Sequence, residues 1–234
     1  TLVREPETKH SVIAHPLRVT GAGRIGAVAT PVQAVAKRTL DIAGAVGLLL
    51  FCLPVFIVIA VMVRMDGGPV FFAHERVGRG GRLFGCLKFR SMVTDSDRRL
   101  AALLASDPTA RTEWESTRKL RHDPRVTWIG RFLRATSLDE LPQLVNVLRG
   151  DMSLVGPRPV QTAELAAHYG AASAHYLSVR PGLTGPWQIS GRSDTSYAQR
   201  VALDVAYVAN PSILTDLRIL LRTPLAVLAR RGAY

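Results

Sequence analysis

The chain has 234 residues and a formal net charge of +12 at pH 7, because 30 Lys and Arg residues outnumber 18 Asp and Glu residues. Its length allows one large domain or two small ones, and its basic balance favours nucleic acid, anionic lipid headgroups or phosphorylated substrates as partners. The two cysteines, Cys52 and Cys86, lie far apart in the sequence, which argues against a disulfide framework or a cysteine-rich zinc site.

Residues 1–36 are polar, are interrupted by Gly, Ala and Pro, and show no sustained period, so we expect a flexible N-terminal extension. An uncharged, mostly apolar run then extends from Ile42 to Val63. As a helix that rises about 1.5 Å per residue, this run would reach about 33 Å, enough to cross a hydrocarbon core of about 30 Å. No second apolar run of similar length follows, which argues against a multi-pass transporter.

Pro54 lies near the middle of the apolar run. It removes a backbone donor and clashes with the preceding turn, so the helix must bend or break there. Lys37 and Arg38 precede the run and Arg64 follows it, although positive charge normally marks only the cytoplasmic end of a span. We therefore predict a re-entrant membrane helix over residues 37–65.

Residues 66–234 are expected to form a cytoplasmic catalytic domain. Strands are predicted at residues 70–72 and 83–89, which together resemble a small hairpin with basic edges. Helices are predicted over residues 95–119, 139–148, 161–176 and 212–229, with loops at 150–159 and 180–192. The predicted fold class is α+β and predominantly helical.

Residues 127–134 interleave aromatic and basic side chains. This pattern suits an amphipathic helix in the headgroup region, although packing of its apolar side on a soluble core explains it nearly as well. The helix over residues 212–229 also combines leucines with arginines, and it too could rest on the bilayer. The charged segment over residues 95–119 is better explained as a solvated surface helix.

The strongest candidate for chemistry is residues 137–143, Ser-Leu-Asp-Glu-Leu-Pro-Gln. Ser137 and Glu140 have the spacing of a capping box, whereas the position of Pro142 points to Asp139 as the cap. Either assignment places Asp139 at the positive end of a helix, which favours carboxylates and binds phosphate. On spacing alone, an ordinary helix start is the commoner explanation.

Basic residues near the acidic pair favour a substrate with a pyrophosphate group, which would need such cations. They are Arg131, Arg134, Arg149 and Arg158. Residues 88–92 add Lys88 and Arg90, and residues 156–159 fix Arg158 between two prolines. Taken alone, each of these segments is better explained as a turn with a surface cation.

Together these motifs resemble the bacterial sugar transferases, the monotopic polyprenol-phosphate phosphoglycosyl transferases, and most of all the ExoY-like exopolysaccharide initiating enzymes. The resemblance covers residues 37–234 and leaves out residues 1–36. The matching segments are residues 37–41, 69–72, 75–78, 88–92, 137–143, Asn146, 150–153, 156–159 and 180–185. One departure is Leu53, where the family usually has a serine that helps to hold the bend before the proline.

The resemblance implies that a UDP-sugar gives its sugar-1-phosphate to undecaprenyl phosphate, with release of UMP, at the start of surface polysaccharide assembly. It also implies Mg²⁺ and a covalent intermediate on Asp139, with Glu140 holding the metal or orienting the pair. The candidates for binding phosphates are Lys88, Arg90, Arg134 and Arg158. Gln188 and Arg192 are weaker candidates for the nucleotide or sugar end.

The implied location is the bacterial inner membrane, with the catalytic domain on the cytoplasmic face against anionic lipid and no nucleic-acid partner. A homo-oligomer is compatible with the sequence. Two alternatives stay open: a membrane-anchored nucleic-acid binder, which the charge suggests, and a non-catalytic membrane scaffold for polysaccharide assembly. The first lacks a recognisable nucleic-acid-binding motif, and the intact acidic pair argues against the second.

Overall fold

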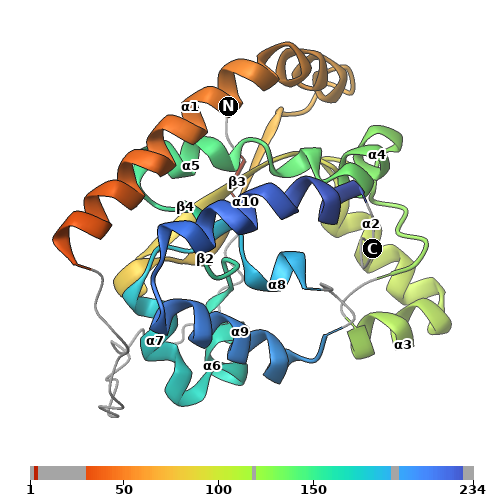
Figure 1. Ribbon diagram of the computed structural model, residues 1–234. Helices are drawn as coiled ribbons and strands as arrows, with labels where there is room; N and C mark the ends of the chain where they lie inside the picture. The colour runs from red at the N-terminus through yellow and green to blue at the C-terminus, as the bar shows by residue number, and fades with distance from the viewer. Residues whose placement is uncertain (1–2, 5–29, 118–119, 191–194, 229–234) are drawn as a thin grey trace.

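The computed structural model describes residues 3–4, 30–117, 120–190 and 195–228, so most of the predicted N-terminal extension lies outside the described residues (Figure 1). The longest element is helix α1 (Pro31–Arg64). It begins at Pro31 rather than at Lys37, because Thr30 and Gln33 form a capping box and a proline is well tolerated in the first turn. The sequence contained this signal, which our domain boundary missed.

Helix α1 continues through Pro54, and its axis changes direction towards its C-terminal end (Figure 1). Among the described residues, it is the one helix long and apolar enough to cross a membrane. Its buried residues are Asp41, Ala45, Ile59 and Val63, so both halves contact the rest of the protein. Helix α1 therefore bends without breaking, as Figure 1 shows, and its re-entrant topology stays a prediction.

The predicted hairpin is confirmed. Strands β2 (Phe71–Val77) and β3 (Leu83–Phe89) are antiparallel, with Phe71 opposite Phe89 and Val77 opposite Leu83. The turn between them contains the short 3₁₀ helix η1 (Arg79–Gly81). Strand β1 (Val3–Arg4) adds a short parallel edge to β2.

The predicted helix over residues 95–119 is two helices, α2 (Ser96–Ser106) and α3 (Pro108–Thr117). The break has a local cause, because Pro108 starts the second helix and the Asp107 carboxylate accepts hydrogen bonds from the next two free backbone N–H groups. Helix α4 (Trp128–Thr136) follows, with Thr127 as its N-cap.

Packing on the protein core explains part of the segment at residues 127–134, and its position in the headgroup region stays a prediction. Ile129 and Leu133 are buried in the core beside Ile59 and Phe89. Trp128, in contrast, projects outward with 64% of its surface exposed. Helix α4 therefore packs one side on the protein and leaves an aromatic side open.

Short strands occur in both segments predicted as loops. Strands β4 (Ser153–Val155) and β5 (Gly182–Thr184) pair in parallel. A Cβ atom on Gly182 would lie 2.1 Å from the Gly156 backbone nitrogen, so only glycine allows these two segments to lie this close. Helix α8 (Pro186–Ile189) follows β5.

The predicted helix over residues 161–176 is divided at Gly170, which has a positive φ. The pieces are α6 (Thr162–His168), η3 (Gly170–Ala172) and α7 (Ser173–Ser178). Helix α9 (Tyr197–Ala209) was not predicted, although its capping box of Ser196 and Gln199 is visible in the sequence. Helix α10 (Ile213–Leu228) was predicted, and it contains Pro224.

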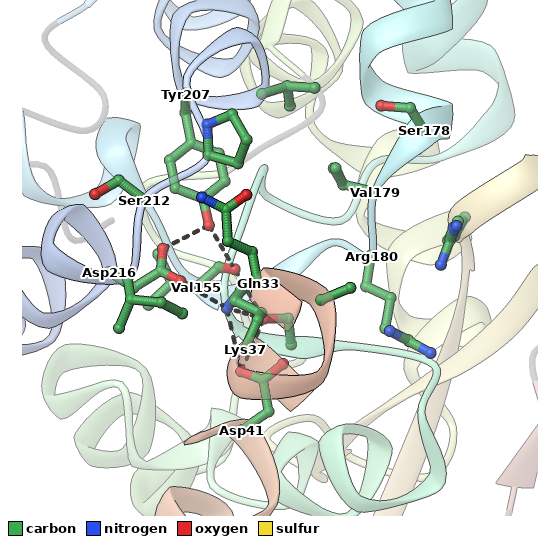
Figure 2. A pocket seen from close by; sticks show the side chains of 16 residues that line it. Gln33, Lys37, Asp41, Val155, Ser178, Val179, Arg180, Tyr207, Ser212 and Asp216 are labelled. Atoms are coloured by element: carbon green, nitrogen blue, oxygen red, sulfur yellow. Dashed lines mark hydrogen bonds and ion pairs between the residues drawn. The ribbon is translucent and has the colours of Figure 1, made fainter. Parts of the chain in front are cut away.

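A buried polar cluster joins α1, β4 and α10 beside a cavity of about 270 Å³. The Lys37 ammonium lies 3.2 Å from Asp41, 3.1 Å from Asp216 and 2.6 Å from the Ser153 hydroxyl. Tyr207 donates a further hydrogen bond to Asp216, as Figure 2 shows. This cluster fixes the N-terminal half of α1 to helix α10.

Candidate active site

Strand β3 and the 3₁₀ helix η2 (Leu138–Glu140) bring one lysine against both members of the acidic pair. The Lys88 ammonium lies 3.3 Å from Asp139 Oδ2 and 2.8 Å from Glu140 Oε1. Asp139 is only 7% exposed. Residues from two separate motifs therefore form one cluster.

Asn146, on helix α5 (Gln143–Arg149), sets the position of this cluster. Its side chain accepts a hydrogen bond from Leu87 N and donates one to Gly85 O, both at 2.9 Å, so it pairs with β3 as a neighbouring strand would. Asn146 is 1% exposed, and buried polar groups need such partners. It ties the segment that carries the acids to the strand that carries Lys88.

The local geometry of the acidic pair differs from both predicted caps. Ser137 has φ 58°, a left-handed conformation, and its side chain makes no capping hydrogen bond. Asp139 lies within η2, and Pro142 is the N-cap residue of α5. The single helix predicted over residues 139–148 is therefore wrong, because Pro142 separates a tight turn from the following helix.

Burial is the main influence on the Asp139 carboxyl and raises its pKa above the ordinary value of 3.8. Lys88 acts in the opposite direction, and Glu140 adds to the increase. Burial acts to lower the pKa of Lys88, but the two carboxylates outweigh it and raise that pKa. The lysine is therefore charged at neutral pH and supports ionisation of Asp139 in a largely dry setting.

Two arginines near the cluster have no carboxylate partner among the described residues. Arg134 is exposed and donates a hydrogen bond to the Ser91 hydroxyl, and its charge opposes the increase in the pKa of Asp139. Arg158 is half-buried over the Trp187 ring, and its charge acts to lower the pKa of Lys88. Unpaired guanidinium groups of this kind are suited to binding phosphate.

Comparison of the sequence with known protein families agrees with this arrangement. The sequence profile of the bacterial sugar transferases matches residues 32–230. The chain belongs to the bacterial sugar transferase family. This membership confirms the resemblance and favours a transferase over the scaffold and the nucleic-acid binder.

Several relatives within this family are about half identical to the chain. The exopolysaccharide production protein ExoY of Rhizobium meliloti strain 1021 is 52% identical over 206 residues, which are 87% of this chain and 90% of the relative. The UDP-galactose-lipid carrier transferase of Erwinia amylovora is 53% identical over 198 residues. The undecaprenyl-phosphate galactose phosphotransferase of Salmonella typhimurium is 52% identical over 198 residues. The chain spans 41% of each of the last two relatives.

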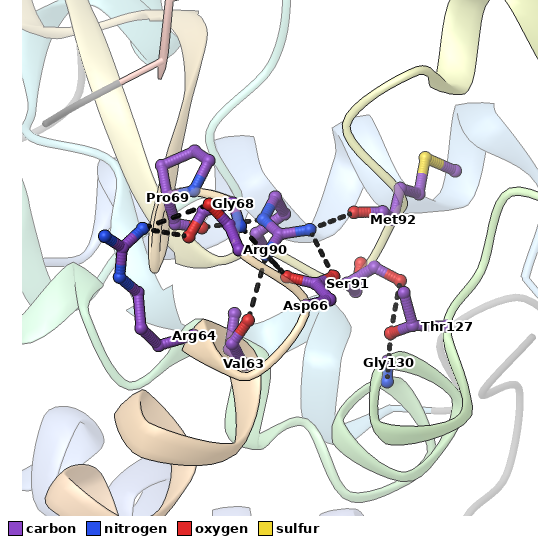
Figure 3. A network of polar contacts seen from close by, with 11 residues as sticks. Val63, Arg64, Asp66, Gly68, Pro69, Arg90, Ser91, Met92, Thr127 and Gly130 are labelled. Carbon is purple, nitrogen blue, oxygen red and sulfur yellow. Dashed lines mark hydrogen bonds and ion pairs between the residues drawn. The ribbon is translucent and has the colours of Figure 1, made fainter.

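The structure gives Arg90 a different setting from the other predicted phosphate ligands of this sugar transferase. Its guanidinium is bound to both carboxylate oxygens of Asp66 and to the carbonyl groups of three residues, as Figure 3 shows. Those carbonyls belong to Val63, Pro69 and Met92. Because all its nitrogens have partners and Arg90 is 7% exposed, we remove it from the phosphate-binding set.

The predicted nucleotide-side residues are only partly described. Gln188 is half-buried on α8, whereas Arg192 lies outside the described residues. Sequence reasoning missed the neighbouring Trp187, whose ring contacts the guanidinium groups of Arg158 and Arg200. A single tryptophan in a Gly- and Pro-rich segment was the available signal.

The acidic pair suits a magnesium ion. Mg²⁺ keeps several waters and is usually bound by one or two carboxylates together with substrate phosphates. Among the residues that the structure describes, no group of three or more His, Cys, Asp or Glu side chains could hold a metal ion. The Lys88 ammonium contacts both Asp139 and Glu140, so a bound magnesium ion would share these two carboxylates with the lysine.

Proposed function

We propose that this sugar transferase moves a sugar-1-phosphate from a UDP-sugar to undecaprenyl phosphate and so initiates synthesis of an exopolysaccharide or related surface glycan. The observation that carries the proposal is the contact of Lys88 with a nearly buried Asp139 and with Glu140. The names of relatives support it, since they include a UDP-galactose-lipid carrier transferase and an undecaprenyl-phosphate galactose phosphotransferase.

In the first half-reaction, a carboxylate oxygen of Asp139 attacks the phosphorus that carries the sugar. The new bond joins Asp139 to that phosphorus, and the bond from phosphorus to the bridging oxygen breaks. UMP leaves with the bridging oxygen and its electron pair, which leaves an aspartyl-phosphosugar on the protein. Lys88 stabilises the ionised nucleophile, and Arg134 and Arg158 bind the diphosphate oxygens.

In the second half-reaction, a phosphate oxygen of undecaprenyl phosphate attacks the same phosphorus. The bond to Asp139 breaks, the carboxylate is restored, and undecaprenyl-diphospho-sugar is released. Asp139 and Glu140, together with substrate oxygens and water, would hold Mg²⁺, which when bound offsets negative charge on the diphosphate.

The long apolar helix and the family membership support membrane association. We place the protein on the inner membrane with its active site on the cytoplasmic face. A bent α1 that enters and leaves on one side would keep Asp139 within reach of a soluble sugar nucleotide and a membrane-embedded acceptor. Labelling of cysteines introduced near Lys37 and near Arg64 tests this topology, because both should react only from the cytoplasm.

The function is tested by measuring UMP release from a panel of UDP-sugars with undecaprenyl phosphate and Mg²⁺. We expect release with at least one donor and its loss in Asp139→Asn. Near-normal release from Asp139→Asn would remove Asp139 from the nucleophile role. A folded protein that releases UMP from no donor would favour the non-catalytic scaffold.

A further inference from the structure

An apolar groove lies between the C-terminal half of α1 and helix α4. Its volume is about 550 Å³, and only apolar side chains line it. Pro54, Val58 and Met62 form the α1 wall, while Trp128 and Phe132 form the α4 wall. Because Val58 and Trp128 are 57% and 64% exposed, the groove is open on its outer side.

The groove and the acidic cluster share the short helix η2. Leu138 lines the groove and directly precedes Asp139 in η2. Lys88 contacts Asp139 on the other side, and Arg134 extends from the same helix as the α4 wall. The apolar lining of the groove therefore reaches the residue next to the proposed nucleophile.

We propose that the groove binds the isoprene units nearest the phosphate of the polyprenyl phosphate acceptor. This inference rests on the proposed function and adds where the acceptor lies during the second half-reaction. The two ends of such a lipid match the two ends of the site, because its hydrocarbon fits the apolar walls and its phosphate fits the cations. A hydrocarbon chain without a phosphate end would match only the groove.

The groove also gives the bend of α1 a specific role. Pro54, Val58 and Ile59 line the groove, and Ile59 also belongs to the core cluster that contains Leu133. The direction of α1 after Pro54 therefore sets the distance between the α1 wall and α4. The segment of α1 that follows Pro54 thus forms one side of the acceptor site.

Replacing either of two valines on α1 by tryptophan provides a matched test of the groove. Val58 lines the groove, whereas Val61, three residues later on α1, does not. Their exposed fractions are similar, at 57% and 59%. Val58→Trp fills the groove, and Val61→Trp adds the same apolar bulk outside it, so an effect on membrane binding alone would appear in both variants.

The two half-reactions are then measured separately with an accepted UDP-sugar. The single-turnover burst of UMP without lipid reports the first, and transfer to undecaprenyl phosphate or to a prenyl phosphate of two isoprene units reports the second. We expect both variants to keep the burst. Val58→Trp should lower kcat/KM for both acceptors by about tenfold or more, the scale on which filled or lost apolar contacts discriminate substrates, and Val61→Trp should not.

Equal transfer by the two variants would overturn the groove proposal while leaving the proposed function intact. A loss of the UMP burst in Val58→Trp alone would also overturn it, because the groove would then serve the donor. If the wild-type protein gives no UMP burst and no transfer, the proposed function fails, and the acceptor groove fails with it.

Discussion

The Lys88 ammonium lies 3.3 Å from Oδ2 of Asp139, and this contact joins a β-hairpin to the 3₁₀ turn that carries the proposed nucleophile. The same ammonium also contacts Glu140, at 2.8 Å. A lysine held in this way has two effects. It favours the ionised form of a buried carboxyl, and it places positive charge where a phosphoryl group would approach.

Replacement of Lys88 by Met should slow the first half-reaction by about 100-fold, the usual effect of removing one charge-stabilising group. It should also move the acid limb of the pH profile to higher pH. Burial already raises the pKa of Asp139, and Lys88 counteracts that increase. The rate falls as pH drops through this pKa, because the protonated carboxyl is not nucleophilic. Bursts of UMP release measured across pH test this, with Lys88→Arg as the charge-retaining control.

Arg90→Met should lower the free energy of unfolding by about 2–4 kcal/mol, because it leaves Asp66 and three carbonyl groups without their donor. Arg90→Lys should restore little of the lost stability, since an ammonium group cannot reproduce the planar, two-pronged donor geometry of the guanidinium. Unfolding in detergent is the measurement. Arg98→Met is the control, because Arg98 has 84% of its side chain exposed, and it should change stability by less than about 0.5 kcal/mol. Equal stability of the Arg90 and Arg98 variants would refute the structural role.

Ser137 is the one described residue other than glycine with a positive φ, at 58°. The left-handed conformation costs an L-residue about 1–2 kcal/mol, and glycine avoids this cost. Ser137→Gly should therefore maintain or raise the midpoint of thermal unfolding. Ser137→Val should lower it, because a β-branched side chain is strained in this conformation. A Val variant as stable as the Gly variant would contradict the observed geometry.

Asp204, on α9, is another buried carboxyl, and burial raises its pKa to about 6. The Tyr169 hydroxyl donates to it at 2.8 Å. Because the folded pKa lies above the ordinary value of 3.8, the stabilising contribution is complete below pH 3.8 and is lost as pH rises through about 6. The shift corresponds to at most about 3 kcal/mol.

Asp204→Asn keeps an acceptor for Tyr169 and has no charge to bury. It should therefore remove the part of the stability loss that the wild type shows between pH 4 and 6. Free energies of unfolding measured at several pH values give the comparison. A variant with the same pH dependence as the wild type would show that Asp204 is not the group responsible.

Local sequence patterns predicted much of the secondary structure correctly. Strand β3 and the helices α4 and α10 lie where their patterns predicted, whereas β2 continues to Val77, beyond the strand predicted at residues 70–72. Helix breaks at Pro108 and Gly170 were missed, although both residues were visible as breakers. At both positions the prediction followed the spacing of apolar residues and disregarded a proline or glycine that interrupts a helix.

The site depends on contacts that one sequence does not reveal. The acidic pair, Lys88 and Arg158 were found from their motifs, and the structure places them in one neighbourhood. The roles of Asn146 and Arg90 follow only from packing between distant segments, since Asn146 pairs with a strand about sixty residues earlier. No local pattern separates a buried structural arginine from one that binds phosphate.

The proposed covalent role of Asp139 is tested most directly by mapping the adduct formed with an accepted UDP-sugar and Mg²⁺ in the absence of lipid. We predict one equivalent of UMP per active protein and a sugar-phosphate mass on the peptide that contains Asp139. Hydroxylamine or undecaprenyl phosphate should remove this mass, and Asp139→Asn should not form it. UMP released only after the lipid is added, with no modified peptide, would contradict the account.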